Sequence, residues 1–399
     1  MKRMVNATLF ICISLVLISF VFSCGDDDDS MANPTMTPTV TPTVTNTPQE
    51  ATTFFKTFGG ENYDYGFCSE QTSDGGYIVV GETYSYGAGS LDIYLIKADE
   101  FGNEIWSRTY GGDRADHGSQ VHQTNDGGYI ISGYTGNFGV PDVNIVLLKT
   151  DSMGNEQWKS FFGGSDFTVD YSLLITSDNG YIIAGARANK PYLVKTDQTG
   201  LLEWEKIYAD YRRCYSIQQL PSGGYILAGG SHYYTACLYE VDRAGEIVWS
   251  HDYSDLGQIY SVVRQNDGSL VATGSSTDNW SYLIKTDSTG IFEWKTIFNE
   301  EGCGYQRSEG LVSDSFGGFV VITTCWYSAD SYPRTVIMTR FNAAGEIDWS
   351  TDTELIAGKS IVTTADDGYL TCGWANENDD LPDGDIGLFK TDFYGQVAN

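Results

Sequence analysis

The sequence lacks the short motifs that mark the commonest catalytic centres. It contains no Gly-x-Ser-x-Gly, no His-Glu-x-x-His and no glycine-rich phosphate loop. Its four histidines do not stand at metal-ligand spacing, and the absence of any Cys-x-x-Cys pair argues against a zinc site. Catalysis by these familiar routes therefore has little support in the sequence.

Positive charge is also scarce. The chain has 23 Lys and Arg residues against 53 Asp and Glu residues, a net charge of −30 at pH 7. Such a chain repels nucleic acid and anionic lipid surfaces, so neither is expected as a partner. No stretch shows an amphipathic helical period. Instead, short segments rich in β-branched and aromatic residues alternate with Gly, Asp, Asn and Ser, which predicts an all-β protein.

The chain is rich in internal repetition. An Asp or Asn followed three residues later by Gly occurs seven times, at Asp99, Asp151, Asp197, Asp242, Asp287, Asn342 and Asp392. A turn glycine precedes an aromatic residue at Tyr77, Tyr129, Tyr181, Tyr225, Phe319 and Tyr369, with a degenerate copy before Leu270. Seven copies of roughly fifty residues, each with four short strands, predict a seven-bladed β-propeller.

A third landmark, a tryptophan shortly after each Asp-x-x-Gly, occurs only six times, at Trp106, Trp158, Trp204, Trp249, Trp294 and Trp349. The last copy lacks it together with its fourth strand. At the other end of the chain, residues 54–60 (FFKTFGG) align with residues 106–112 (WSRTYGG), which places Phe54 at the tryptophan position. We therefore predict that the N-terminal strand completes the last blade and that deleting residues 53–60 destabilises the ring.

Residues 106–135, WSRTYGGDRADHGSQVHQTNDGGYIISGYT, resemble the bacterial β-propeller repeat called SBBP. The resemblance covers essentially residues 54–395 and is best in the first two copies. Copies four to six depart from it, with Glu240 and Arg340 in place of the usual lysine and Thr323 in place of a glycine. The resemblance implies an extracytoplasmic protein, lipid-anchored or secreted, and no shared catalytic residues.

The N-terminal region predicts a membrane-anchored lipoprotein in three parts. Residues 1–23 are typical of a lipoprotein signal peptide, because Lys2 and Arg3 precede an apolar run and a lipobox-like end before Cys24. An ordinary cleaved signal is the alternative. Residues 24–52, acidic and then rich in Thr-Pro pairs, form an extended tether, and residues 53–399 form the propeller. Diacylation of Cys24 would anchor the protein in the cell envelope, and the acidic run resembles a signal for display on the outer surface.

We interpret the repeated side chains as structural rather than functional. We interpret the tryptophans as the packing layer between blades rather than as sugar-stacking platforms. The lysine before each Asp-x-x-Gly turn (Lys97, Lys149, Lys195, Lys285 and Lys390) is expected to pair locally with carboxylates on an exposed strand end. Since His117 and His122 are five residues apart, regular strand alternation would put them on opposite faces. The sequence does not decide whether disulfides form within a blade or between neighbouring blades, because the cysteines do not recur at one repeat position.

Acidic residues supply the candidate binding site. Asp64, Asp116 and Asp170 follow the Gly-Gly loop and precede the innermost strand, at the expected mouth of the central channel. Carboxylates arranged around such a mouth could hold Ca²⁺ or a cationic ligand. In the alternative interpretation they accept backbone N–H groups in turns. No catalytic residue is assigned.

The sequence favours a binding or scaffolding module for an extracytoplasmic protein or glycan, because repeats give a rigid frame with variable loops. We expect a monomer. The alternative is a polysaccharide-active hydrolase or lyase, in which carboxylates would face each other across the channel. A purely structural envelope component is the third hypothesis.

Overall fold

The computed structural model describes residues 52–397, except residues 137–143, 165, 167, 210–211, 232–234, 300–301, 327–332 and 376–383. The predicted signal peptide, Cys24 and nearly all of the tether lie outside the described residues. Within the described ranges every regular element is a strand, and no helix is long and apolar enough to span a membrane.

The strands fall into four sets by their position in the repeat. The first strands are β2 (Asp64–Gln71), β6 (Asp116–Gln123), β10 (Thr168–Ile175), β14 (Arg212–Gln219), β18 (Leu256–Arg264), β22 (Tyr305–Ser313) and β26 (Ala357–Thr363). The second strands are β3 (Tyr77–Thr83), β7 (Tyr129–Thr135), β11 (Tyr181–Arg187), β15 (Tyr225–Ser231), β19 (Leu270–Ser276), β23 (Phe319–Trp326) and β27 (Tyr369–Ala375).

The third strands are β4 (Asp92–Ala98), β8 (Asn144–Thr150), β12 (Lys190–Thr196), β16 (Ala236–Val241), β20 (Ser281–Thr286), β24 (Pro333–Phe341) and β28 (Asp385–Thr391). The fourth strands are β5 (Glu104–Tyr110), β9 (Glu156–Phe162), β13 (Leu202–Ile207), β17 (Ile247–Tyr253), β21 (Phe292–Phe298), β25 (Ile347–Asp352) and β1 (Phe54–Phe58).

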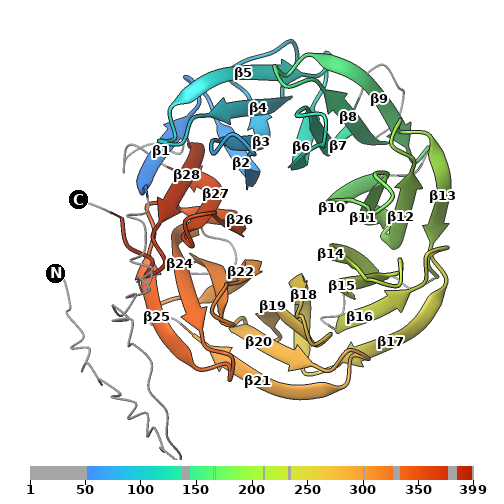
Figure 1. Ribbon diagram of the computed structural model, residues 1–399, viewed down its shortest axis with the longest axis vertical. Helices are drawn as coiled ribbons and strands as arrows, with labels where there is room; N and C mark the ends of the chain where they lie inside the picture. Colours follow the sequence, from blue (N-terminus) through green and yellow to red (C-terminus); the bar gives the residue numbers. More distant parts are fainter. Residues whose placement is uncertain are drawn as a thin grey trace, which may run out of the picture. The chain divides into compact units, whose positions relative to one another are not determined.

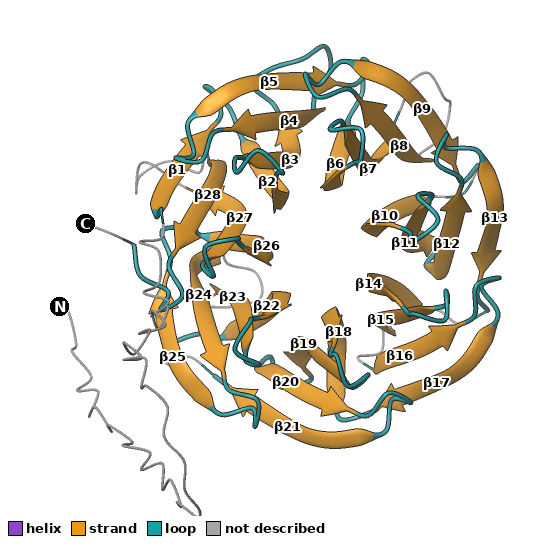
Figure 2. Ribbon diagram, viewed as in Figure 1, coloured by secondary structure: helices purple, strands orange, loops and turns teal. Residues whose placement is uncertain are grey.

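These strands form seven antiparallel four-stranded sheets that stand as blades around one axis (Figure 1). Blades 1 to 6 each use four consecutive strands, beginning with β2–β5, and blade 7 uses β26, β27, β28 and β1. The first strands surround the centre, and the fourth strands form the outer rim (Figure 2). The prediction of an all-β, seven-bladed propeller is confirmed.

The three sequence landmarks meet at each interface between blades. The ring of Trp106, on the fourth strand of blade 1, lies 6.0 Å from the ring of Tyr129 on the second strand of blade 2. A Cβ atom on Gly154, the glycine of the Asp-x-x-Gly turn of blade 2, would lie 2.8 Å from the same indole. The repeated tryptophan therefore requires both the aromatic and the glycine of the next copy, which supports its interpretation as a packing residue.

Blade 7 is joined to blade 1 through the N-terminal strand. β1 pairs with β28 along its whole length, with Phe54 opposite Lys390 and Phe58 opposite Ile386. The ring of Phe54 lies 5.5 Å from that of Tyr77, and a Cβ on Gly102 would lie 2.6 Å from Phe54. Phe54 thus occupies the place that tryptophan takes at the other interfaces, and both ends of the described chain contribute to one sheet.

The lysine series lies in the core, so the expectation of an exposed strand end was wrong. Four of these residues are at most 5% exposed, namely Lys97, Lys149, Lys195 and Lys390. In blade 1 the ammonium of Lys97 lies 3.1 Å from the carboxylate of Asp74 in the first hairpin and donates to the carbonyl of Ala98. A Cβ on Gly76 would lie 2.5 Å from that ammonium. The same Cβ would lie 2.4 Å from the backbone carbonyl of Ala98, so this carbonyl, more than the lysine, disfavours a side chain before the landmark aromatic.

Two copies depart from this arrangement. In blade 5, Ser269 replaces this glycine, and Lys285 Nζ lies 3.9 Å from Asp267, a longer separation than in the blades with glycine. In blade 4, Ser222 replaces the aspartate of the turn and Glu240 replaces the lysine. Glu240 accepts a hydrogen bond from Trp249 Nε1 at 2.7 Å. The loss of the acid in the turn thus coincides with the loss of the lysine.

One disulfide lies within blade 6. It joins Cys303, which precedes β22, to Cys325 on β23, with a Cα–Cα distance of 5.5 Å. The other described cysteines, Cys68, Cys214, Cys237 and Cys372, are buried. The cysteines therefore do not form a repeated framework.

Candidate functional site

Every innermost strand contains a β-bulge at the same place. In β2 the register against β3 shifts between Gly66 and Cys68, and in β10 the register against β11 shifts between Asp170 and Ser172. The other five innermost strands shift at the equivalent position. A bulge inserts one extra residue and turns its side chain in a new direction. The seven inserted residues, here called the bulge ring, are Phe67, Ser119, Tyr171, Tyr215, Tyr260, Glu309 and Lys359.

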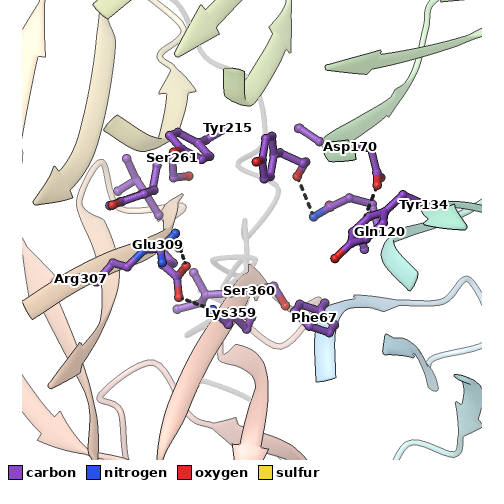
Figure 3. A pocket seen from close by; sticks show the side chains of 17 residues that line it. Phe67, Gln120, Tyr134, Asp170, Tyr215, Ser261, Arg307, Glu309, Lys359 and Ser360 are labelled. Carbon is purple, nitrogen blue, oxygen red and sulfur yellow. Dashed lines mark hydrogen bonds and ion pairs between the residues drawn. The ribbon is translucent and has the colours of Figure 1, made fainter. Parts of the chain in front are cut away.

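All seven members of the bulge ring line one cavity at the centre of the propeller (Figure 3). The cavity has a volume of about 350 Å³, within the range of roughly 300–1,000 Å³ that is usual for small-molecule sites. Its remaining lining residues are Gln120, Tyr134, Asp170, Ser172, Ser261, Arg307, Gly310, Leu311, Ser360 and Ile361. The fold therefore aims one side chain from each blade at a single ligand-sized space.

Three tyrosines of the bulge ring form an arc along one wall of the cavity. The ring centroids of Tyr171 and Tyr215 are 5.0 Å apart, and those of Tyr215 and Tyr260 are 5.1 Å apart. The rings are tilted by 58° and 54° relative to each other, an arrangement in which the edge of one ring approaches the face of the next. This tyrosine arc gives the cavity a continuous aromatic wall across blades 3, 4 and 5.

A group of three charged side chains continues the wall in blades 6 and 7. Glu309 lies between two cations, 3.1 Å from Arg307 Nη2 and 2.8 Å from Lys359 Nζ. The guanidinium of Arg307 lies 4.2 Å from the centre of the Tyr260 ring, which joins the charged triad to the tyrosine arc. Burial raises the pKa of the Glu309 carboxyl, but the charges of Arg307 and Lys359 outweigh burial and hold this pKa below its usual value.

Asp170 faces the triad from another part of the cavity wall (Figure 3). Its carboxylate is 2% exposed and accepts hydrogen bonds from Ser132 and, at 3.0 Å, from Ser119. Burial raises the pKa of Asp170 to about 6, although both serine hydroxyls lower it. The two carboxyls that line the cavity, Asp170 and Glu309, thus have pKa values shifted in opposite directions.

The three predicted acidic residues fall into two groups. Asp64 and Asp116 are the first residues of β2 and β6, fully buried, and neither lines the cavity. They accept the backbone N–H groups of Gly60 (2.9 Å) and Gly112 (2.7 Å), as the turn interpretation expects. Asp170 is the third residue of β10, and it alone of the three reaches the cavity.

No group of three or more His, Cys, Asp or Glu side chains is arranged to hold a metal ion in the part of the chain that the structure describes. Ca²⁺ binding by Asp64, Asp116 and Asp170 together therefore has no geometric support within that part, since Asp170 is not at the equivalent position. Whether any one of them contacts a ligand stays a prediction.

The expected separation of the two histidines was wrong. The bulge in β6 inserts Ser119 between His117 and His122, so the two side chains return to the same side. His117 Nδ1 lies beside Glu82 of β3, and His122 Nδ1 lies 2.6 Å from Glu70 of β2. Both therefore contact blade 1, but each has its own carboxylate partner.

Sequence reasoning missed the bulge ring itself. Each of its members stands ten residues before the landmark residue of its copy, as Phe67 stands before Tyr77 and Tyr260 before Leu270. The available signal was that copies with similar strands differ strongly in chemistry at this one position.

Comparisons with known proteins support the fold. No family model matches the chain, and no curated protein matches its sequence, so the resemblance to the SBBP repeat stays a prediction. The structure is similar to the WD40 β-propeller domain of Doa1, at 10% identity and a TM-score of 0.57 over 85% of this chain and 95% of that one. The chain is a seven-bladed β-propeller.

Two further solved structures are similar. The Dos1 propeller matches with 13% identity and a TM-score of 0.54, over 86% of this propeller chain and 97% of the other. A streptogramin B lyase matches with 11% identity and a TM-score of 0.54, over 86% and 99%. At such identities the likeness shows the fold alone.

Proposed function

We propose that this propeller is an extracytoplasmic binding module whose ligand, a glycan or a segment of a protein, occupies the central cavity. The observation that carries the proposal is the bulge ring. Seven separate bulges direct seven side chains into one space, and bulges of this kind commonly aim side chains at functional sites. A rigid ring with one variable side chain per blade suits recognition, and no catalytic motif accompanies it.

A screen on the full chain tests this proposal. Thermal unfolding is measured with a panel of glycans and peptides, because a ligand that binds only the folded state raises the unfolding midpoint. We expect at least one ligand to raise the midpoint of the native chain and not that of Tyr215→Ala. A ligand effect that survives in Tyr215→Ala and Tyr171→Ala would place binding outside the cavity and overturn the proposal.

Two cavity carboxyls with opposite pKa shifts favour a second candidate, an enzyme that acts on a polysaccharide. Such a pair can divide the roles of general acid and general base. Against this, Asp170 is held by Ser119 and Ser132, and Glu309 is held by Arg307 and Lys359. Turnover of a polysaccharide that is abolished by Asp170→Asn, with binding retained, would establish the enzyme instead.

The cellular location belongs to the same proposal. We place the propeller on the cell envelope, held by a lipid on Cys24 and raised from the membrane by the tether. In the native chain we expect the protein in the membrane fraction, and in Cys24→Ala we expect it to be released, since acyl chains supply the anchoring energy. Membrane association that is unchanged in Cys24→Ala would contradict the anchor and leave the cavity proposal intact.

A further inference from the structure

The charged triad on the cavity wall has the opposite balance of charge to the chain as a whole. The chain as a whole carries −30, yet the triad combines two cations, Arg307 and Lys359, with one carboxylate, Glu309. Asp170, the other acidic residue on the wall, already accepts two hydroxyl donors from the protein. An anionic group would therefore find its complement at the triad and not elsewhere on the cavity wall.

The triad also has a donor that the protein leaves unused. Arg307 Nε is buried and has no hydrogen-bond partner. A buried N–H without an acceptor is costly, and charged donors are the most costly of all. The Nε edge of a guanidinium is one of the edges that bind carboxylate and similar oxyanions in a bidentate manner. A ligand oxyanion bound beside Nε would satisfy this donor.

The two cations are held in place before any ligand binds. Arg307 lies over the face of Tyr260, and Lys359 Nζ lies 5.6 Å from the ring of Trp374 while it contacts Glu309. Ordering long side chains on binding weakens affinity, so side chains fixed in advance favour it. The two cations are thus preorganised, with one carboxylate shared between them.

The tyrosine arc lies next to this anion site. Aromatic faces carry partial negative charge and attract the C–H face of a sugar ring, which is apolar and weakly positive. Hydroxyl and amide groups that can bond sugar hydroxyls stand along the rest of the wall, at Ser261, Gln120 and Ser360. Aromatic faces, neutral polar groups and a cationic end thus occur within one cavity.

We propose that the cavity binds an anionic saccharide, whose sugar ring lies against the tyrosine arc and whose carboxylate or sulfate group binds at Arg307 and Lys359. This inference rests on the proposed binding function and names its ligand class. A neutral glycan would leave the cationic end unsatisfied, and a cationic peptide would meet like charge there.

The test compares matched saccharides on the full chain. Isothermal titration is run with a trigalacturonate, a sulfated galactose trisaccharide and neutral galactotriose, at low and at moderate salt. We expect an anionic probe to bind and the neutral probe to bind at least tenfold more weakly, with the difference reduced by salt because charges are screened. The two anionic probes decide between carboxylate and sulfate.

Variants then locate the anion site. Arg307→Gln is expected to weaken binding of the anionic probe by about 10- to 100-fold, the usual effect of losing a charge-assisted hydrogen bond. Lys206→Met is the matched control, since Lys206 lies on the outer strand β13, where it pairs with Glu246, and its removal changes the net charge equally. If Arg307→Gln does not fold, Arg307→Lys and Lys359→Met address the same site.

Three results would overturn the inference. Equal affinity for the anionic and neutral probes would remove the anion site, as would equal losses in Arg307→Gln and Lys206→Met. Failure of every saccharide to bind would do the same. In that case the binding proposal itself is judged separately, by whether a peptide from the thermal screen raises the midpoint and loses its effect in Tyr215→Ala.

Discussion

Deletion of residues 53–60 is expected to leave the propeller largely unfolded at physiological temperature. The deletion removes β1, and with it the pairing to β28 and the side chains of Phe54 and Phe58, which are 8% and 7% exposed. Truncating one buried Phe costs about 3–5 kcal/mol, so losing two approaches the whole stability of a typical domain, about 5–15 kcal/mol. The effect on stability should exceed that of any single substitution at the rim.

Circular dichroism and the thermal unfolding midpoint measure this effect. Deleting residues 41–48 is the matched control, because it shortens the tether by the same number of residues and leaves β1 intact. A synthetic peptide of residues 53–60, added to the deleted chain, is expected to restore part of the midpoint by pairing with the free edge of β28. An unchanged midpoint in the deleted chain would show that β1 does not hold the ring closed.

The same strand shows why the fold could be predicted from the sequence. A propeller interface uses a tryptophan, an aromatic residue and a turn glycine, and they recur along the chain because each touches the neighbouring copy; Phe54 and Leu270 are the exceptions. Trp106, Tyr129 and Gly154 illustrate the rule, and Phe54 was recognisable as the missing tryptophan from alignment alone. Residues constrained by a repeated contact leave a repeated signal.

The candidate site could not be predicted in the same way. A β-bulge has no distinctive residue type here, since Phe67, Ser119 and Glu309 occupy equivalent places. Regular alternation assigns the wrong face to every residue beyond the bulge, which is why His117 and His122 were misplaced. The acidic pattern led to Asp64 and Asp116, which are buried at strand starts, and only Asp170 lies on the cavity wall.

The lysine series was identified but misplaced, for a related reason. A lysine beside an acidic turn is normally interpreted as part of a surface ion pair, because buried lysines are rare. The structure buries Lys390 completely, with its ammonium 3.0 Å from each oxygen of Asp366 and 2.9 Å from the carbonyl of Thr391. The glycine before Tyr369 was the overlooked signal, since a Cβ there would lie 2.2 Å from the carbonyl of Thr391 and 2.4 Å from that ammonium.

Asp366→Ala is accordingly expected to destabilise the propeller by about 3–5 kcal/mol, because it leaves the buried ammonium of Lys390 without a counter-charge. Burial already lowers the pKa of Lys390 despite Asp366, so without this partner the lysine must lose its proton or draw in water. The double variant Asp366→Ala with Lys390→Met should recover part of the loss, since it removes the unpaired charge as well. Urea unfolding of the two single variants and the double variant measures the coupling.

The chain supplies its own control for this substitution in blade 5. Asp267 is 65% exposed and lies 3.9 Å from Lys285, whose side chain is 21% exposed. Asp267→Ala should therefore cost less than about 1 kcal/mol, as expected for a solvent-screened pair. Equal losses from Asp366→Ala and Asp267→Ala would mean that burial of the lysine does not set the strength of these pairs.

The pH dependence gives the same argument an independent check. Burial raises the pKa of Asp366, but Thr364, Lys390 and the N–H of Gly368 together hold it below its usual value of 3.8. A carboxyl with a lowered pKa in the folded state stabilises that state above the unfolded pKa, and the contribution is lost as the pH falls through the folded pKa. The difference in unfolding free energy between the native chain and Asp366→Ala should thus be present in full at about pH 5 and shrink as the pH falls below 3.8. A difference that does not change with acidification would show that Asp366 acts through packing rather than through its charge.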